Sequence, residues 1–215
     1  MSIVQTANRF TKKKGSLTLI RHGSTKLNSE DKIRGWSDPH LDNKGEQEAT
    51  ETGKQLKGAG LDGLITSDLD RAKATAKGIS KVTGVPIIGE TPGLRPWNLG
   101  NYTGKPVSEA NPVMQNFAAK TPDKPVPGGE SFNSFKNRFL NTAKSIIREH
   151  QGKHIGIVTH SRGDRIMQAW EDAGMPDDNS INIKSFLQKG IDPGAFREVS
   201  MPPSKKKIQF QAVAL

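Results

Sequence analysis

Short apolar runs alternate along this chain with longer segments in which apolar positions recur every three or four residues. Residues 17–20 and 155–159 are runs of strand length, and residues 63–65 form a third, shorter strand candidate. Each run is followed by polar residues and then by a segment of helical character. Because such alternation is typical of α/β folds, we predict a three-layer sandwich with a mostly parallel central sheet.

The clearest helical pattern covers residues 132–149. Its apolar side chains lie three or four residues apart, at Phe132, Phe135, Phe139, Ala143 and Ile146. We interpret these aromatic residues as core packing. Residues 164–173, after the strand candidate at 155–159, also have helical character.

Two further helices are predicted from their end signals. Asp42 is a suitable N-cap for a helix over residues 43–57. Gly84, with a proline two residues beyond it, ends a helix over residues 69–82. Near the end of the chain, residues 208–212 alternate as a strand with one buried face, and we expect an edge strand there.

Residues 92–127 differ from the rest of the chain because they are rich in Pro, Gly and Asn. They contain one short helical segment, residues 107–119, and no strand pattern. We interpret them as an excursion over the sheet edge, within a single domain over residues 15–215. Residues 1–14 are expected to be a flexible basic segment ahead of this domain.

The charge of +10 invites a nucleic-acid interpretation, but its distribution argues against one. Arg9 with residues 12–14 contributes +4, and residues 205–207 contribute +3, so seven of the ten excess charges lie near the chain ends. Aromatic residues make up 6% of the chain, too few for stacking platforms. We expect no specific nucleic-acid partner, although anionic ligands are attracted.

The cysteine content and the apolar segments of the chain bear on the compartment in which the protein is found. The chain has no cysteine, which excludes disulfides and thiolate zinc sites. It has no long apolar stretch, and residues 1–14 lack the hydrophobic region of a secretory signal. We therefore expect a cytoplasmic protein without a membrane partner, and the oligomeric state stays open.

Two histidines directly follow strand candidates. His22 lies within Arg21-His22-Gly23, and His160 follows residues 155–159. A neutral imidazole can attack phosphorus, a neighbouring guanidinium can neutralise phosphoryl oxygens, and glycine leaves room for a substrate. The non-catalytic alternative for Arg21-His22-Gly23 is a turn with a surface cation. For His160 it is a histidine whose hydrogen bonds are made within the protein at a strand end.

The topology predicts where these side chains meet. Ser67, after the third strand candidate, is a suitable helix N-cap, and it places Arg71 in the first helical turn. Because the carboxyl ends of parallel strands share one sheet edge, Arg21, His22, Arg71 and His160 are expected to gather there. The alternative for Arg71 is a solvated helix cation.

An ordered series of motifs extends from residue 16 to residue 165. It reads Leu19-Ile-Arg-His-Gly23 with Asn28, Arg34-Gly35-Trp36-Ser-Asp38, Leu41 to Ala49, Thr66 to Ala72, Gly128-Gly-Glu130-Ser131 and Val158-Thr-His160. In this order and spacing the chain resembles the histidine phosphatase superfamily, the phosphoglycerate mutase-like proteins.

The resemblance implies that His22 takes the phosphoryl group from a phosphomonoester and that water hydrolyses the phosphohistidine. Arg21, Arg71 and His160 would complete the catalytic set by holding the phosphoryl oxygens. The substrate-binding residues would be Asn28, Arg34, Gly35, Glu130 and Ser161. Asn28 could equally cap a loop, and Glu130 could open the helix that follows it. The resemblance also implies that residues 92–127 cover the substrate. It implies no metal and no other cofactor.

One part of the family pattern is missing. The family's general acid is a glutamate in Leu-x-Glu-x-x-x-Gly-x-x-x-Gly, and residues 94–104 place Pro96 at the glutamate position. General acid catalysis contributes roughly 10²- to 10⁴-fold in rate. Glu130 or Glu90 could replace it if folded into reach. The sequence thus predicts a phosphatase, with a binder of phosphorylated ligands as the alternative and a mutase less favoured, and it leaves the substrate open.

Overall fold

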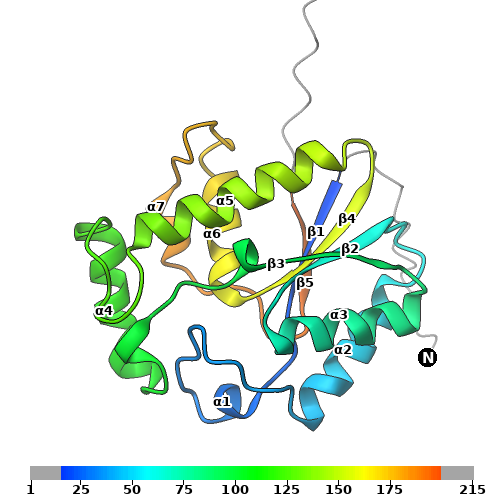
Figure 1. The fold of residues 1–215 in the computed structure, drawn as a ribbon, viewed down its shortest axis with the longest axis horizontal. Coiled ribbons are helices and arrows are strands. Elements are labelled where there is room, and N and C mark those ends of the chain that lie inside the picture. The colour runs from blue at the N-terminus through cyan, green and yellow to red at the C-terminus, as the bar shows by residue number, and fades with distance from the viewer. Residues whose placement is uncertain (1–15, 200–215) are drawn as a thin grey trace, which may run out of the picture.

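The structure is a computed structural model that describes residues 16–199. Five strands form one sheet in the order β3-β2-β4-β1-β5 (Figure 1). Their bounds are β1 Ser16–Arg21, β2 Gly63–Ser67, β3 Ile87–Thr91, β4 His154–Thr159 and β5 Phe196–Val199. The first four are parallel, and β5 is antiparallel to β1. The predicted α/β fold with a mostly parallel sheet is confirmed.

Helices cover both faces of the sheet. Helices α2 (Asn43–Leu56) and α3 (Asp70–Thr83) pack against Ile20 and Val158, whereas α5 (Phe132–Glu149) and α6 (Ser161–Glu171) lie on the other face (Figure 1). Both faces of β1 and β4 are therefore buried, as their continuous apolar runs predict.

The end signals of α2 and α3 are confirmed in part. The Asp42 side chain accepts a hydrogen bond from the Gly45 N–H, and Gly84 adopts the left-handed conformation after α3. The predicted cap at Ser67 is wrong, since the N-cap is Leu69. Ser67 instead pairs with Thr91 as the last residue of β2, so the strand extends past the predicted boundary.

Helix α5 matches its predicted bounds and buries the predicted apolar face. Ser131 is its N-cap, and the hydroxyl accepts from the Ser134 N–H. Helix α6 begins at Ser161, three residues earlier than expected, and ends at Glu171. It therefore starts immediately after His160, which is its N-cap residue.

The sequence analysis missed both edge strands of the described sheet. In β3 only alternate residues are partly buried, and Ile88 is 42% exposed, so no continuous apolar run marks it. Strand β5 contains Arg197, whose charge is neutralised by Asp164 and Glu171. The edge strand expected at residues 208–212 lies outside the described residues.

Residues 92–127 carry the short helices η1 (Pro92–Leu94), η2 (Gly100–Tyr102) and α4 (Val107–Lys120). They contact the loop after α1 (Lys26–Ser29). The Ile33 N–H donates to the Lys105 carbonyl, and the Gly104 N–H donates to the Ile33 carbonyl. The short helix α7 (Ile183–Phe186) packs beside α6. Among residues 16–199, every helix is too short or too polar to cross a bilayer. A cytoplasmic location stays a prediction.

Candidate active site

The structure brings the four candidate catalytic side chains together at the carboxyl edge of the sheet. His22 and His160 follow the neighbouring parallel strands β1 and β4, and their ring centroids lie 5.0 Å apart, edge to face. The Arg71 Nε donates to His22 Nε2 at 3.3 Å. All four side chains, including Arg21 at the end of β1, are buried.

The tautomer of His22 follows from its contacts. Its Nδ1 lies 2.7 Å from the carbonyl oxygen of Gly23, which can only accept, so Nδ1 must carry the hydrogen. The Nε2 atom is then the unprotonated nitrogen. Gly23 itself is held because its N–H donates to the Thr75 hydroxyl. The ring is thereby fixed with its unprotonated nitrogen toward Arg71.

Burial and positive neighbours keep both histidines neutral. Burial holds the pKa of His22 well below its usual range, and the charges of Arg71, Arg21 and Arg34 add to this effect. The pKa of His160 is lowered in the same way, first by burial and then by Arg71. Burial lowers the pKa of Arg21 and of Arg71 to about 10, so both stay charged at neutral pH.

Arg71 is held by the loop that precedes α2. Its Nη1 donates to the carbonyl of Ser37 at 2.7 Å, and its Nη2 donates to the carbonyl of Gly35 at 3.1 Å. Gly35 has a φ of 51°, and a Cβ there would lie 2.8 Å from the Thr103 hydroxyl. Glycine is therefore needed for this loop to aim its carbonyl at Arg71.

Two other arginines face the same site. Arg21 donates to the carbonyl of Ile191 at 2.7 Å. Arg34 makes one hydrogen bond, to the Lys32 carbonyl at 3.3 Å, and forms no ion pair within residues 16–199. Burial lowers the pKa of Arg34, and its charge acts on both histidines.

His160 contacts Ser67, which the sequence analysis predicted to be a helix N-cap. Its Nε2 lies 3.0 Å from the Ser67 hydroxyl, at the end of β2, while its buried Nδ1 has no partner among the described residues. In the sequence, the position of Ser67 next to Thr66 after a strand candidate was the one feature that could have indicated this contact. The Ile191 carbonyl, in a loop far along the chain, had no sequence signal at all.

Two predicted substrate-binding residues have structural contacts instead of contacts to the histidines. The Asn28 amide oxygen accepts from the N–H and the hydroxyl of Thr25, which is the capping alternative. The Glu130 carboxylate accepts from the Asn98 N–H and pairs with Arg138 at 2.7 Å. Ser161 is the first residue of α6, next to His160.

Among the described residues, neither Pro96 nor the candidate acid Glu90 contacts the histidines. Pro96 is buried, and its carbonyl accepts from the Trp36 indole at 2.8 Å. Glu90 is exposed and lines a groove beside α5 with Glu149. Within residues 16–199, no carboxylate is hydrogen-bonded to His22 or His160, and no cluster of three potential metal-ligating side chains is present.

The chain belongs to the histidine phosphatase superfamily, since the model of its branch 1 matches residues 17–184. The predicted family is thereby confirmed. A probable phosphoglycerate mutase GpmB of Salmonella paratyphi B is 32% identical over 146 residues, which cover 66% of this chain and 67% of that protein. The corresponding protein of Salmonella newport matches equally.

Solved structures share the fold. A mycobacterial glucosyl-3-phosphoglycerate phosphatase in complex with VO3 has a TM-score of 0.68 at 19% identity, covering 86% of this chain and 92% of that chain. The alpha-ribazole phosphatase from Shigella flexneri has a TM-score of 0.67 at 23% identity, covering 85% and 89%. At these identities the comparison establishes the fold alone.

Proposed function

We propose that this protein is a phosphomonoester hydrolase that works through a phosphohistidine on His22. The observation that carries the proposal is the arrangement at His22 Nε2. This nitrogen is unprotonated, the Arg71 guanidinium is aimed at it, and a second buried imidazole lies 5.0 Å away from ring to ring. An anionic phosphoryl group fits between these donors.

In the first step Nε2 attacks phosphorus, an N–P bond forms and the bond to the ester oxygen breaks. The oxygen leaves as an alkoxide or aryloxide, which takes a proton from solvent. Arg21, Arg71 and Arg34 counter the charge on the phosphoryl oxygens. In the second step water attacks phosphorus and the N–P bond breaks, which returns neutral His22 and inorganic phosphate.

Hydrolysis is favoured over a mutase reaction because no carboxylate within residues 16–199 is hydrogen-bonded to either histidine. A mutase must return the phosphoryl group to a bound hydroxyl, and Pro96 stands where the family's glutamate would assist. The relatives named phosphoglycerate mutase support a phosphorylated small molecule as substrate, as do the neighbours named phosphatases. The missing glutamate at Pro96 also supports a second candidate function, a protein that binds phosphorylated ligands and hydrolyses them slowly or not at all.

The test is turnover of a panel of phosphorylated metabolites, with 4-nitrophenyl phosphate as the reactive control substrate. His22→Asn should abolish turnover and the acid-labile phosphoryl-enzyme, because an amide nitrogen cannot attack phosphorus. His150→Asn is the matched control, since His150 caps α5 at the opposite sheet edge. Parental activity in His22→Asn would contradict the mechanism, and an inactive parent that binds phosphate would favour the binder.

A further inference from the structure

Three partly buried arginines outside the site pair with carboxylates. These pairs are Arg95 with Asp68 at 2.6 Å, Arg138 with Glu130 at 2.7 Å and Arg197 with Asp164 at 2.7 Å. Arg162 differs from them, because it forms no ion pair within residues 16–199. Its hydrogen bond goes from Nη2 to the amide oxygen of Asn111, at a long 3.3 Å. A guanidinium has five N–H donors, so most of its donor capacity is left for a ligand.

The surroundings of Arg162 raise the cost of leaving its charge uncompensated. Burial, together with the charges of Arg165 and Arg34, lowers its pKa to about 9, and no carboxylate offsets these effects. The guanidinium is therefore still charged at neutral pH. A charge withdrawn from water without a counterion is costly, and an anionic ligand would remove that cost.

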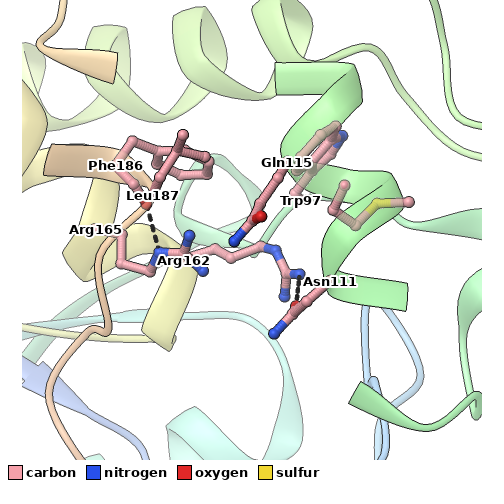
Figure 2. Close-up of a pocket in the computed structure, with 8 residues that line it drawn as sticks. Trp97, Asn111, Gln115, Arg162, Arg165, Phe186 and Leu187 are labelled. Carbon is pink, nitrogen blue, oxygen red and sulfur yellow. Dashed lines mark hydrogen bonds between the residues drawn. The ribbon is translucent and has the colours of Figure 1, made fainter. Parts of the chain in front are cut away.

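Arg162 projects into a small pocket between α6, α4 and the segment around α7 (Figure 2). Polar groups in the lining come from Arg162, Arg165, Asn111 and Gln115, and the rest of the lining is mainly apolar, including Trp97 and Phe186. No carboxylate lines it. Figure 2 shows the Arg162 guanidinium beside Asn111, with Gln115 on the same helix.

Arg165 has a different part in this pocket. Its Nε donates to the Phe186 carbonyl at 2.6 Å, and its guanidinium lies 4.7 Å from the centre of the Phe186 ring. It is thus already anchored and contributes mainly positive potential. Arg162 is the residue whose donors are available for a direct contact.

Arg162 connects the pocket to the helix end that carries His160. Arg162 is two residues beyond His160, in the first turn of α6. The charge of Arg34 acts on both histidines and on Arg162, so Arg34 lies within range of both places. A ligand with its phosphoryl group at His22 can therefore extend past Arg34 toward Arg162.

We propose that Arg162, assisted by Asn111, binds a second anionic group on the substrate, a carboxylate or a second phosphate. The inference rests on the proposed function and defines its substrate class. Preferred substrates are phosphomonoesters whose alcohol portion carries this second anion. The planar guanidinium can donate two parallel hydrogen bonds to either group, which a neutral amide or hydroxyl does not match.

The test compares substrates that differ in one anionic group. The phosphate ester of 3-hydroxypropanoate is compared with that of its carboxamide, and 4-carboxyphenyl phosphate with 4-carbamoylphenyl phosphate. Propane-1,3-diol bisphosphate against 3-hydroxypropyl phosphate tests the second phosphate. We expect kcat/KM to favour the anionic member of at least one alkyl pair by about 10- to 150-fold, the range of one charge-assisted hydrogen bond.

Arg162→Gln should reduce this preference to within about threefold of unity while turnover of the neutral partner stays near parental, since only the second anion loses its contact. Arg162→Lys should retain part of it. Arg148→Gln, an exposed arginine at the end of α5, is the matched control. A preference that survives in Arg162→Gln, or equal parental rates for each pair, would overturn the inference while leaving the proposed function intact.

If no ester is turned over, the proposed function fails first. The inference is then decided by calorimetric binding of propane-1,3-diol bisphosphate and propyl phosphate. Tighter binding of the bisphosphate to the parent, lost in Arg162→Gln and kept in Arg148→Gln, would support it. Equal affinities in the parent would refute it.

Discussion

Replacing Arg71 tests the electrostatic core of the site, because this residue has three separable effects. Its side chain is 1% exposed and donates to two loop carbonyls and to His22. Arg71→Met keeps most of the side-chain volume and removes the charge and all donors. The carbonyls of Ser37 and Gly35 lose their partner, and each loss costs about 1–3 kcal/mol when the group stays dry. With two such losses, we expect the free energy of unfolding to fall by about 2–6 kcal/mol.

The second effect of Arg71→Met concerns anion affinity. Vanadate or phosphate loses at least one charge-assisted hydrogen bond, worth about 1.5–3 kcal/mol, so the dissociation constant should rise by roughly 10- to 150-fold. The third effect concerns protonation. Arg71 is the largest charge that lowers the pKa of His22, so its removal should raise that pKa. The acid limb of the kcat/KM profile, where His22 takes up its proton, should then move to higher pH.

Calorimetric titration with vanadate, urea unfolding and a pH profile with 4-nitrophenyl phosphate separate these effects. Arg148→Met, on the exposed end of α5, controls for the loss of one positive charge from the whole protein. A folded Arg71→Met variant with parental vanadate affinity and an unmoved acid limb would refute the reasoning. Lower stability alone would assign Arg71 to the loop and not to the anion site.

Two further predictions concern protons. Without a carboxylate at Pro96, the leaving group departs unprotonated, so log kcat/KM should fall steeply with its pKa across aryl and alkyl phosphates, and Pro96→Glu should flatten that slope. A shallow slope in the parent would show that another acid acts, with Glu130→Gln as the next comparison. Separately, His22 and His160 have lowered pKa values, so below about pH 6.5 the unfolded chain binds protons that the folded chain does not. The free energy of unfolding should therefore fall between pH 7 and pH 5, by up to ~1.4 kcal/mol per pH unit for each histidine. Urea unfolding measures it, and a flat profile would contradict the buried neutral state.

The sequence could predict the central strands and the gathering of His22, His160, Arg21 and Arg71 because both depend on local pattern. A strand buried on both faces is a continuous apolar run, and its carboxyl end has a defined place in a parallel sheet. The edge strand β3 escaped prediction, since only alternate residues are partly buried and Ile88 faces solvent. Its partner strand supplies the hydrogen bonds, and the sequence of β3 alone does not show them.

The roles of polar residues were harder to predict, because they depend on which partners the fold supplies. Glu130 and Asn28 fit a family motif, yet their side chains are engaged by Arg138 and by Thr25. Ser67 looked like a helix cap and instead contacts His160, since β2 continues for longer than its apolar residues suggest. Such contacts join residues far apart in sequence, and local periodicity carries no information about them.

The arginines show most clearly that the role of a polar residue depends on partners that the sequence does not reveal. In the sequence, Arg138 and Arg162 are equivalent charges on amphipathic helices. The fold places a carboxylate against Arg138 and none within ion-pairing distance of Arg162 among residues 16–199. A partly buried guanidinium that is paired with a carboxylate stabilises the fold, whereas one without a counterion has donors left for an anionic ligand. Tertiary structure therefore decides which arginines of this chain are paired with carboxylates and which keep donors for other groups.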